Sequence, residues 1–202
     1  MRWPLVVAMV VGLLAGSVIA LIVVSGTPGR EASGPQPLTT GKALIGGPFS
    51  LVDHKGRSVT EKDFAGRKML VFFGFTSCPD VCPSGLQVIS AALDKLGPKA
   101  ETITPVLITV DPGRDTPAVL AEYVKSFHPR LVGLTGSEEQ VQAAAKAYRV
   151  YAKKVPDDKS PGGYTIEHSA YLYLMDESGG FLTHFPSTVG VDRLAQELAK
   201  AL

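Results

Sequence analysis

The stretch FFGFTSCPDVCP, residues 72–83, decides the fold, because it sets the chain's two cysteines directly after an apolar run. Residues 68–75 are almost continuously apolar and rich in aromatic side chains, which predicts a short buried strand. Pro83 lacks an amide hydrogen and fits the first turn of a helix, so we expect a helix that begins near Pro83 and runs to Leu96. Both thiols then stand at or just before a helix N-terminus, where amide groups and the helix dipole favour the thiolate.

The segments on either side of this stretch predict an alternation of strands and helices. Apolar runs and turn residues predict strands over residues 49–53, 58–59, 103–110, 131–134, 148–155, 170–175 and 181–185. Capping signals predict a single helical turn after Thr60 and helices over 117–127 and 137–147. An amphipathic pattern predicts a last helix over 191–202, and residues 156–164 predict a polar loop. A cysteine pair between the first core strand and its helix is typical of thioredoxin-like domains. We therefore expect an α/β fold with a thioredoxin-like mixed central sheet flanked by helices.

The N-terminal part of the chain has a different character. Residues 4–24 are apolar without a single charge, and about 20 such residues span a bilayer, so we expect one N-terminal transmembrane helix. The alternative is a cleaved signal peptide, whose apolar core is usually shorter, and either possibility exports the rest of the chain. The predicted organisation is a transmembrane anchor over 1–24, a Gly/Pro/Ser-rich linker over 25–47 and a folded domain over 48–202.

Composition narrows the classes of function. The 202 residues carry a formal net charge of +1 with mixed signs, and no basic run is interleaved with aromatics, so we expect no nucleic-acid partner. Two cysteines are too few for a disulfide scaffold. Their spacing allows a disulfide, a metal pair that needs a third ligand, or two inert thiols, and inert thiols are uncommon in an exported protein.

A third metal ligand would have to come from the four histidines. His54 in a polar turn and His128 before a proline are most simply interpreted as solvated surface residues, and His184 lies on the last predicted hairpin. His168 differs, because it immediately precedes the strand predicted over 170–175. In thioredoxin-like sheets the residue that enters this strand faces the cysteine turn. The alternative is a histidine with a purely structural role at a loop–strand junction.

Three motifs together resemble one family. The sequences FTSCPDVCP over 75–83, VDPGRDTP over 110–117 and HSA over 168–170 closely resemble, in this order, the Sco/SenC family of copper-handling proteins. An anchor followed by a linker is also the layout of that family. The resemblance covers the chain from about Pro48 to its C-terminus.

The resemblance implies a metallochaperone that binds one copper ion, Cu(I) or Cu(II), through Cys78, Cys82 and His168. It implies delivery to the binuclear copper centre of cytochrome c oxidase subunit II. Two thiolates and an imidazole suit copper, although zinc accepts the same ligands. The resemblance also suggests that Asp111 orients His168 or tunes the copper from behind the ligands. The alternative for Asp111 is a turn or capping residue.

The same resemblance implies partners, and the N-terminal segment, which lacks an Arg- and Ser-rich presequence, indicates a location. Besides the oxidase subunit we expect a periplasmic copper donor chaperone, a thioredoxin-like reductant and the membrane itself. The expected location is the bacterial inner membrane, with a single span and the domain in the periplasm; the alternative is the mitochondrial inner membrane facing the intermembrane space. The alternative function is a thiol–disulfide oxidoreductase, with Cys78 and Cys82 as redox pair, that keeps the oxidase cysteines reduced. Whether the protein is an enzyme as well as a metallochaperone stays open at this point.

Overall fold

The structure is a computed structural model, and the residues it describes are 44–202. The predicted anchor over 1–24 and the predicted linker up to residue 43 lie outside the described residues and stay predictions. Within 44–202, no helix combines the length and the apolar character that crossing a membrane requires.

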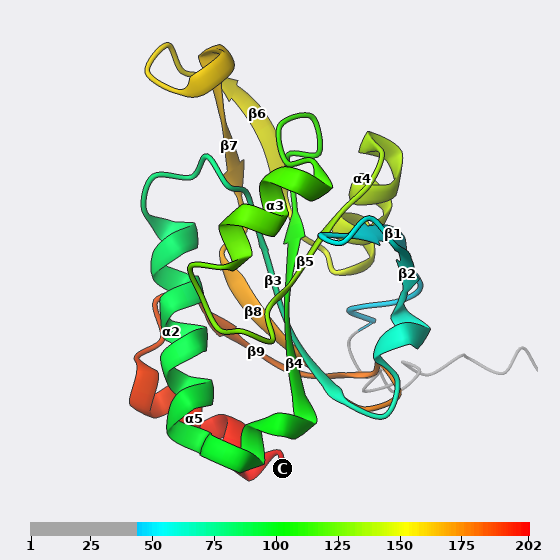
Figure 1. Cartoon of the computed structure of the whole chain (residues 1–202), viewed down its shortest axis with the longest axis vertical. Helices are drawn as coiled ribbons and strands as arrows, with labels where there is room; N and C mark the ends of the chain where they lie inside the picture. Colours follow the sequence, from blue (N-terminus) through cyan, green and yellow to red (C-terminus); the bar gives the residue numbers. More distant parts are fainter. Residues whose placement is uncertain (1–43) are drawn as a thin grey trace, which may run out of the picture. The chain divides into compact units, whose positions relative to one another are not determined.

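A seven-stranded mixed sheet forms the centre of the domain (Figure 1). The central strand β3 pairs in parallel with β4 and antiparallel with β8, while β4 and β5 are parallel. This confirms the predicted mixed sheet of a thioredoxin-like α/β fold. In spatial order the strands are β2 (Ser58–Thr60), β1 (Ser50–Asp53), β5 (Val132–Thr135), β4 (Ile103–Thr109), β3 (Lys68–Gly74), β8 (Tyr171–Met175) and β9 (Phe181–Pro186).

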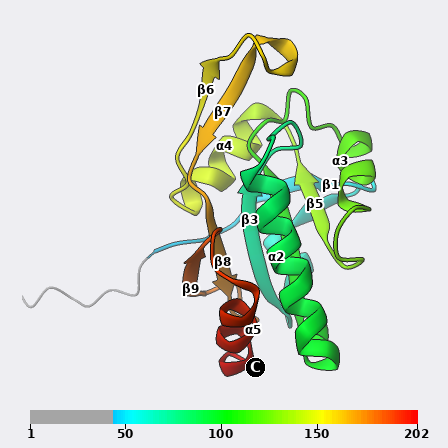
Figure 2. The same cartoon turned by 90° about the vertical axis from the view of Figure 1, so that its left-hand side faces the viewer.

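Helices cover both faces of this sheet. Figures 1 and 2 show α3 (Pro117–Val124) and α4 (Glu138–Ala147) on opposite faces, and α5 (Val191–Lys200) beside α2 (Val81–Leu96). The predicted N-caps at Thr116 and Ser137 are confirmed. Thr116 accepts a hydrogen bond from the Val119 amide, and Ser137 forms a capping box with Gln140. Within residues 44–202 there are also three short 3-10 helices: η1 (Glu61–Phe64), η2 (Gly97–Thr102) and η3 (Pro161–Gly163).

Successive side chains of β3 point to opposite faces of the sheet, so the strand packs against the helices on both faces. All seven residues of this strand are buried. A Cβ added at Gly85 of α2 would lie 3.4 Å from the Phe72 ring, so Phe72 faces α2. The next ring, Phe73, packs on Tyr148 and Tyr173 at centroid distances of 5.3 and 6.2 Å on the other face. Close packing on both faces restricts the motion of β3, and it therefore fixes the position at which the following turn begins.

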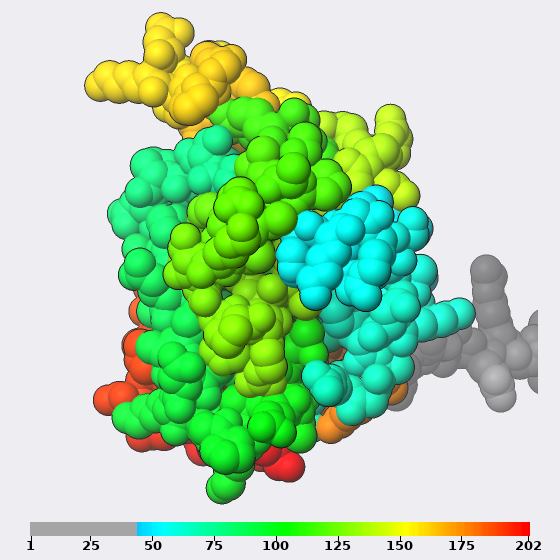
Figure 3. Space-filling model, viewed as in Figure 1, coloured from blue at the N-terminus to red at the C-terminus, as the bar shows by residue number. Residues whose placement is uncertain are grey.

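The region between α4 and β8 differs most from the prediction. The predicted strand over 148–155 begins only at Ala152, because Tyr148 caps α4 and Arg149 adopts a left-handed φ of 56°. The predicted loop over 156–164 contains η3 and leads into an unpredicted strand, β7 (Tyr164–His168). β7 pairs with β6 (Ala152–Pro156) in a separate two-stranded sheet. We call β6, η3 and β7 the ribbon, and it stands out from the packed body of the domain (Figures 2 and 3).

The close approach of β3 to the helix that follows it gives a first prediction. A Cβ at Gly74 would lie 3.0 Å from Cys82 Sγ and 3.3 Å from the Phe72 ring. We expect Gly74→Ala to lower the free energy of unfolding by about 1–3 kcal/mol, because the buried neighbours must shift to admit the methyl group. Urea denaturation of both proteins measures the difference.

Gly113→Ala is the matched control, since the nearest atom to its added Cβ is 3.9 Å away. We expect a change below about 1 kcal/mol for this variant. Equal losses of stability in the two variants would contradict the packing argument.

Candidate metal centre

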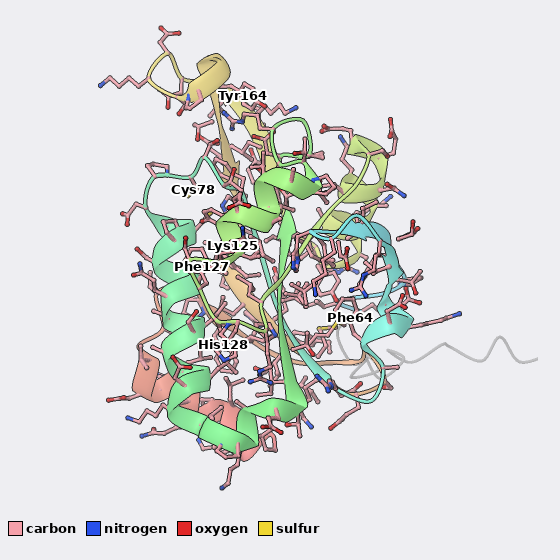
Figure 4. The ribbon with its side chains drawn as sticks, in the orientation of Figure 1. Phe64, Cys78, Lys125, Phe127, His128 and Tyr164 are labelled. Carbon is pink, nitrogen blue, oxygen red and sulfur yellow. The ribbon has the colours of Figure 1, made fainter. Side chains whose placement is uncertain are left out.

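The turn between β3 and α2 presents the two cysteines differently. Cys82 lies in the first turn of α2 and is fully buried, whereas Cys78 precedes the helix and is half-buried. The Cys82 amide donates a hydrogen bond of 3.4 Å to Cys78 Sγ, as expected for an anion-favouring position beside a helix N-terminus. Figure 4 shows Cys78 above α2, at the end of the domain from which the ribbon projects. Neither cysteine is part of a disulfide.

A buried carboxylate holds the start of this turn. Asp115, in the loop between β4 and α3, accepts hydrogen bonds from the Thr76 amide at 3.0 Å and the Thr76 hydroxyl at 2.6 Å. It also accepts a 2.6 Å hydrogen bond from the hydroxyl of Thr109, the last residue of β4. Burial raises the pKa of Asp115, and these hydrogen bonds work against that rise. The carboxylate of Asp115 therefore links the end of β4 to the start of the cysteine turn.

The two thiols have pKa values that move in opposite directions. The pKa of Cys78 falls to about 4, first because the Cys82 thiol donates to its sulfur, then through His168 and the amides of Cys82 and Asp80, while burial opposes the fall. The pKa of Cys82 rises, because its proton is held in the bond to Cys78 and because it is buried. Near neutral pH the metal-free turn therefore holds one thiolate, on the more exposed sulfur, and one thiol.

The ribbon brings His168 to the cysteines from the far side of the sequence. His168 ends β7, and its Nε2 lies 3.6 Å from Cys82 Sγ. Its Nδ1 lies 3.0 Å from the Ser169 carbonyl oxygen, which can only accept, so Nδ1 carries a proton. With Nδ1 carrying the proton of the neutral ring, the lone pair on Nε2 faces Cys82 Sγ. The rings of Phe72 and Phe75 contact the imidazole edge-on at centroid distances of 6.4 and 5.8 Å.

Asp111 lies near this centre but contacts another part of the ribbon. Its fully buried carboxylate accepts hydrogen bonds from Arg114 Nε and from the Tyr164 hydroxyl, the latter at 2.9 Å. The Nδ1 of His168 donates its hydrogen bond to the Ser169 carbonyl oxygen and not to Asp111. The role of Asp111 behind a metal stays a prediction. Reasoning from the sequence missed Arg114 and Tyr164 as ribbon contacts, although the alternation of Tyr164, Ile166 and His168 was a signal for a strand.

The other histidines lie elsewhere. The surface interpretation of His128 is wrong: its side chain is buried, its Nδ1 accepts from the Arg130 amide at 3.2 Å, and burial lowers its pKa. His54 is half-buried and accepts from the Gly133 amide at 3.1 Å. His184 is exposed on β9 and stacks on Phe181.

As arranged here, no group of three or more His, Cys, Asp or Glu side chains within residues 44–202 is positioned to hold a metal ion. What the turn and the ribbon do assemble is one thiolate, one thiol and one imidazole. The chemistry open to them is soft-metal binding or thiol–disulfide exchange.

Comparison with known proteins places this arrangement in a family context. Residues 38–202 match the SCO1/SenC family model. The chain is 43% identical over 165 residues to the mitochondrial SCO1 homolog 1 of Arabidopsis thaliana, covering 81% of this chain and 49% of that protein. It is 38% identical over 181 residues to the SCO2-like protein of Rickettsia prowazekii, covering 90% of this chain and 87% of that one. It therefore spans about half of the plant relative and most of the bacterial one.

Solved structures agree with these relatives. The crystal structure of Arabidopsis thaliana ScoI with copper bound matches with a TM-score of 0.74 at 43% identity, covering 77% of this chain and 96% of that one. The structure of Bradyrhizobium japonicum ScoI with copper bound matches with a TM-score of 0.72 at 44% identity, covering 78% and 99%.

The thiol pair gives the second prediction. We expect the rate of alkylation of the reduced, metal-free protein by iodoacetamide to show an inflection near pH 4, since the pKa of Cys78 is lowered to about 4. A free cysteine would show its inflection at about pH 8.5. Mass spectrometry locates the alkylated residue and measures the rate.

The matched variant is Cys82→Ala, which removes the thiol that donates to Cys78. We expect its inflection to move to higher pH. An inflection near pH 8.5 in the unmodified protein, or no change in the variant, would show that Cys82 does not stabilise the Cys78 thiolate.

Proposed function

This chain belongs to the SCO1/SenC family, and on that premise we propose that it binds one copper ion through Cys78, Cys82 and His168 and passes it on during assembly of cytochrome c oxidase. The observation that carries the proposal is the 3.6 Å separation of His168 Nε2 and Cys82 Sγ, two residues 86 positions apart. This approach of an imidazole to a thiol pair from so far along the chain supports a chemical role for the ring at the site.

The donors fit a soft ion. Sulfur and nitrogen bound to one tetrahedral ion, at zinc bond lengths of about 2.3 Å and about 2.0 Å, lie roughly 3.5 Å apart. The observed separation of 3.6 Å is of that size. Thiolate and imidazole suit Cu(I) and tolerate Cu(II), and copper exceeds zinc in affinity for such sites. Homologous Sco structures hold copper.

Each residue has a part in the proposed binding. Cys78 offers a thiolate at neutral pH, because its pKa is about 4. Cys82 gives up its proton when the ion takes its sulfur, so binding releases a proton. His168 offers Nε2 while the Ser169 carbonyl holds Nδ1 and fixes the ring.

Three ligands leave a position open, through which a thiolate or imidazole of a receiving protein can enter. We propose that the recipient is the binuclear copper centre of oxidase subunit II, and that a separate donor protein loads the site. The proposed location is a bacterial inner membrane with the domain in the periplasm. The mitochondrial inner membrane is the alternative, since the Arabidopsis relative is described as mitochondrial.

The low pKa of Cys78 beside the Cys82 thiol supports a second function, thiol–disulfide exchange. The Cys78 thiolate would attack a partner disulfide, forming a mixed disulfide and releasing one partner thiolate. Cys82, after losing its proton, would attack Cys78 Sγ and release the second partner thiolate. The partner disulfide gains two electrons, and this chain ends as a Cys78–Cys82 disulfide.

Substitution of the imidazole separates the two functions. We expect His168→Ala to keep the fold and lose Cu(II) affinity by more than the roughly 10–100-fold that loss of a supporting contact costs, because a direct ligand is removed. Isothermal titration with Cu(II), together with absorption and paramagnetic resonance spectra, measures the loss. His184→Ala is the control, since that ring is exposed on β9. Unchanged affinity and spectrum in His168→Ala would rule out the ligand assignment while leaving thiol exchange open.

Oxidation of the pair gives a further prediction. Once Cys78 and Cys82 form a disulfide, we expect no copper binding, because the sulfurs can no longer act as thiolates. Treatment with a dithiol reductant should restore one copper per chain. Metal analysis after gel filtration of oxidised and re-reduced samples measures this, and full copper content in the oxidised sample would refute the thiolate ligands.

A further inference from the structure

The ribbon sets where His168 lies, and its strands are not part of the main sheet. β6 and β7 pair with each other, with Ala152 opposite His168 at the base and Pro156 opposite Tyr164 toward the tip. At the base, the Ser169 amide donates to the Tyr151 carbonyl at 2.9 Å. A two-stranded sheet alone is marginally stable, so contacts with the body of the domain must determine its direction.

One side chain on the body makes several of these contacts. Arg114 Nη1 donates to the carbonyl oxygens of Pro161 and Tyr164, at 2.5 and 3.1 Å. Its guanidinium also lies over the Tyr164 ring, 4.0 Å from the centroid. Arg114 therefore reaches η3 and the first residue of β7, both at the tip of the ribbon away from its base.

Asp111 fixes this arginine in place. Its carboxylate, whose side chain is 0% exposed, pairs with Arg114 Nε and also accepts from the Tyr164 hydroxyl at 2.9 Å. The carboxylate thus binds both members of the stacked pair. Hydrogen bonds between charged groups are the strong ones, and a planar guanidinium offers its donors in fixed directions, so this cluster restricts both the distance and the angle of the ribbon.

The cluster also touches the surroundings of the imidazole. The Arg114 guanidinium lies 5.8 Å from the centroid of the Phe75 ring. The same Phe75 ring meets the His168 imidazole edge-on at 5.8 Å. Arg114, Phe75 and His168 therefore form a continuous row of contacts from the loop after β4 to the cysteine turn.

We propose that Arg114, held by Asp111 and stacked on Tyr164, is the positioning residue that locks the ribbon against the loop after β4 and so fixes the approach of His168 to the two sulfurs. The copper-dependent part of this proposal rests on the proposed function, whereas the ribbon's attachment does not. Loosening the lock leaves both sulfurs in place and frees the imidazole, so the ion is held by two firm ligands and one mobile one.

The test uses the full chain and two conservative variants. Arg114→Lys keeps the charge but loses the planar fork, and Tyr164→Phe keeps the ring but loses the hydroxyl that binds Asp111. Lys153→Ala is the matched control, because it removes a cation from the same ribbon and its ammonium has no ion pair or hydrogen bond with any residue from 44 to 202.

The first readout is hydrogen–deuterium exchange of the metal-free protein. For Arg114→Lys we expect amides of residues 152–168 to exchange roughly tenfold faster, the change that loss of one hydrogen bond to a charged group produces, while amides of β3 and β4 keep their rates. We expect a smaller acceleration for Tyr164→Phe and none for Lys153→Ala. Wild-type exchange of the ribbon in both variants, or equal acceleration in β3, would overturn the proposal.

The second readout is the rate at which Cu(II) leaves for a chelator, with the paramagnetic resonance spectrum as signature. We expect Arg114→Lys to release copper roughly tenfold faster and to show a broadened or altered spectrum, since nitrogen ligation becomes heterogeneous. Faster ribbon exchange with an unchanged copper rate and spectrum would overturn the positioning role. If the wild-type protein binds no copper, the proposed function fails, and the exchange experiment still decides whether Arg114 locks the ribbon.

Discussion

The buried carboxylate of Asp115 is the interaction on which the candidate centre depends. It accepts hydrogen bonds from Thr76, at the start of the cysteine turn, and from Thr109, at the end of β4. It therefore ties together the C-terminal ends of two parallel strands at the centre of the sheet. Burial raises its pKa, and the three donors keep the group bonded in an environment that would otherwise disfavour it. Fixing the turn at this point fixes where α2 begins, and so where both sulfurs lie.

The centre is assembled from two kinds of structure. The sulfurs come from a turn between a strand buried on both faces and a helix packed over it, so they are preorganised. The imidazole comes from a ribbon outside the main sheet, which contacts the body through the buried Ile166, the Lys154–Glu138 ion pair and the contacts of Arg114. A rigid thiol pair with an adjustable third group suits the proposed binding and transfer of a copper ion. Two acidic residues of the loop after β4 hold these two parts: Asp115 binds Thr76 in the cysteine turn, and Asp111 binds Tyr164 in the ribbon.

Much of this fold follows from local signals in the sequence. The apolar run of β3, the proline after the cysteines and the caps at Thr116 and Ser137 act over a few residues, and the structure has all of them. The ribbon was missed because its strands bury little and its turn is made of polar residues, so neither strand has the apolar pattern of the main sheet. His128 was misplaced because its burial comes from contacts distant in sequence, with Ser90 and Asp94. The nearness of His168 to the cysteines was expected from family resemblance and fold analogy, and its hydrogen bond to Ser169 was not foreseen.

The bend at Arg149 has a practical consequence for any shortened form of this protein. Arg149 is the non-glycine residue with a left-handed backbone within residues 44–202, and its Nε donates to the Leu44 carbonyl at 3.2 Å. The Gly46 amide bonds in turn to the Ala147 carbonyl at 3.0 Å. A truncation that starts after residue 46 removes both partners from the bend out of which the ribbon rises. Truncated versions made for spectroscopy should therefore retain Leu44, so that their metal parameters describe the intact domain.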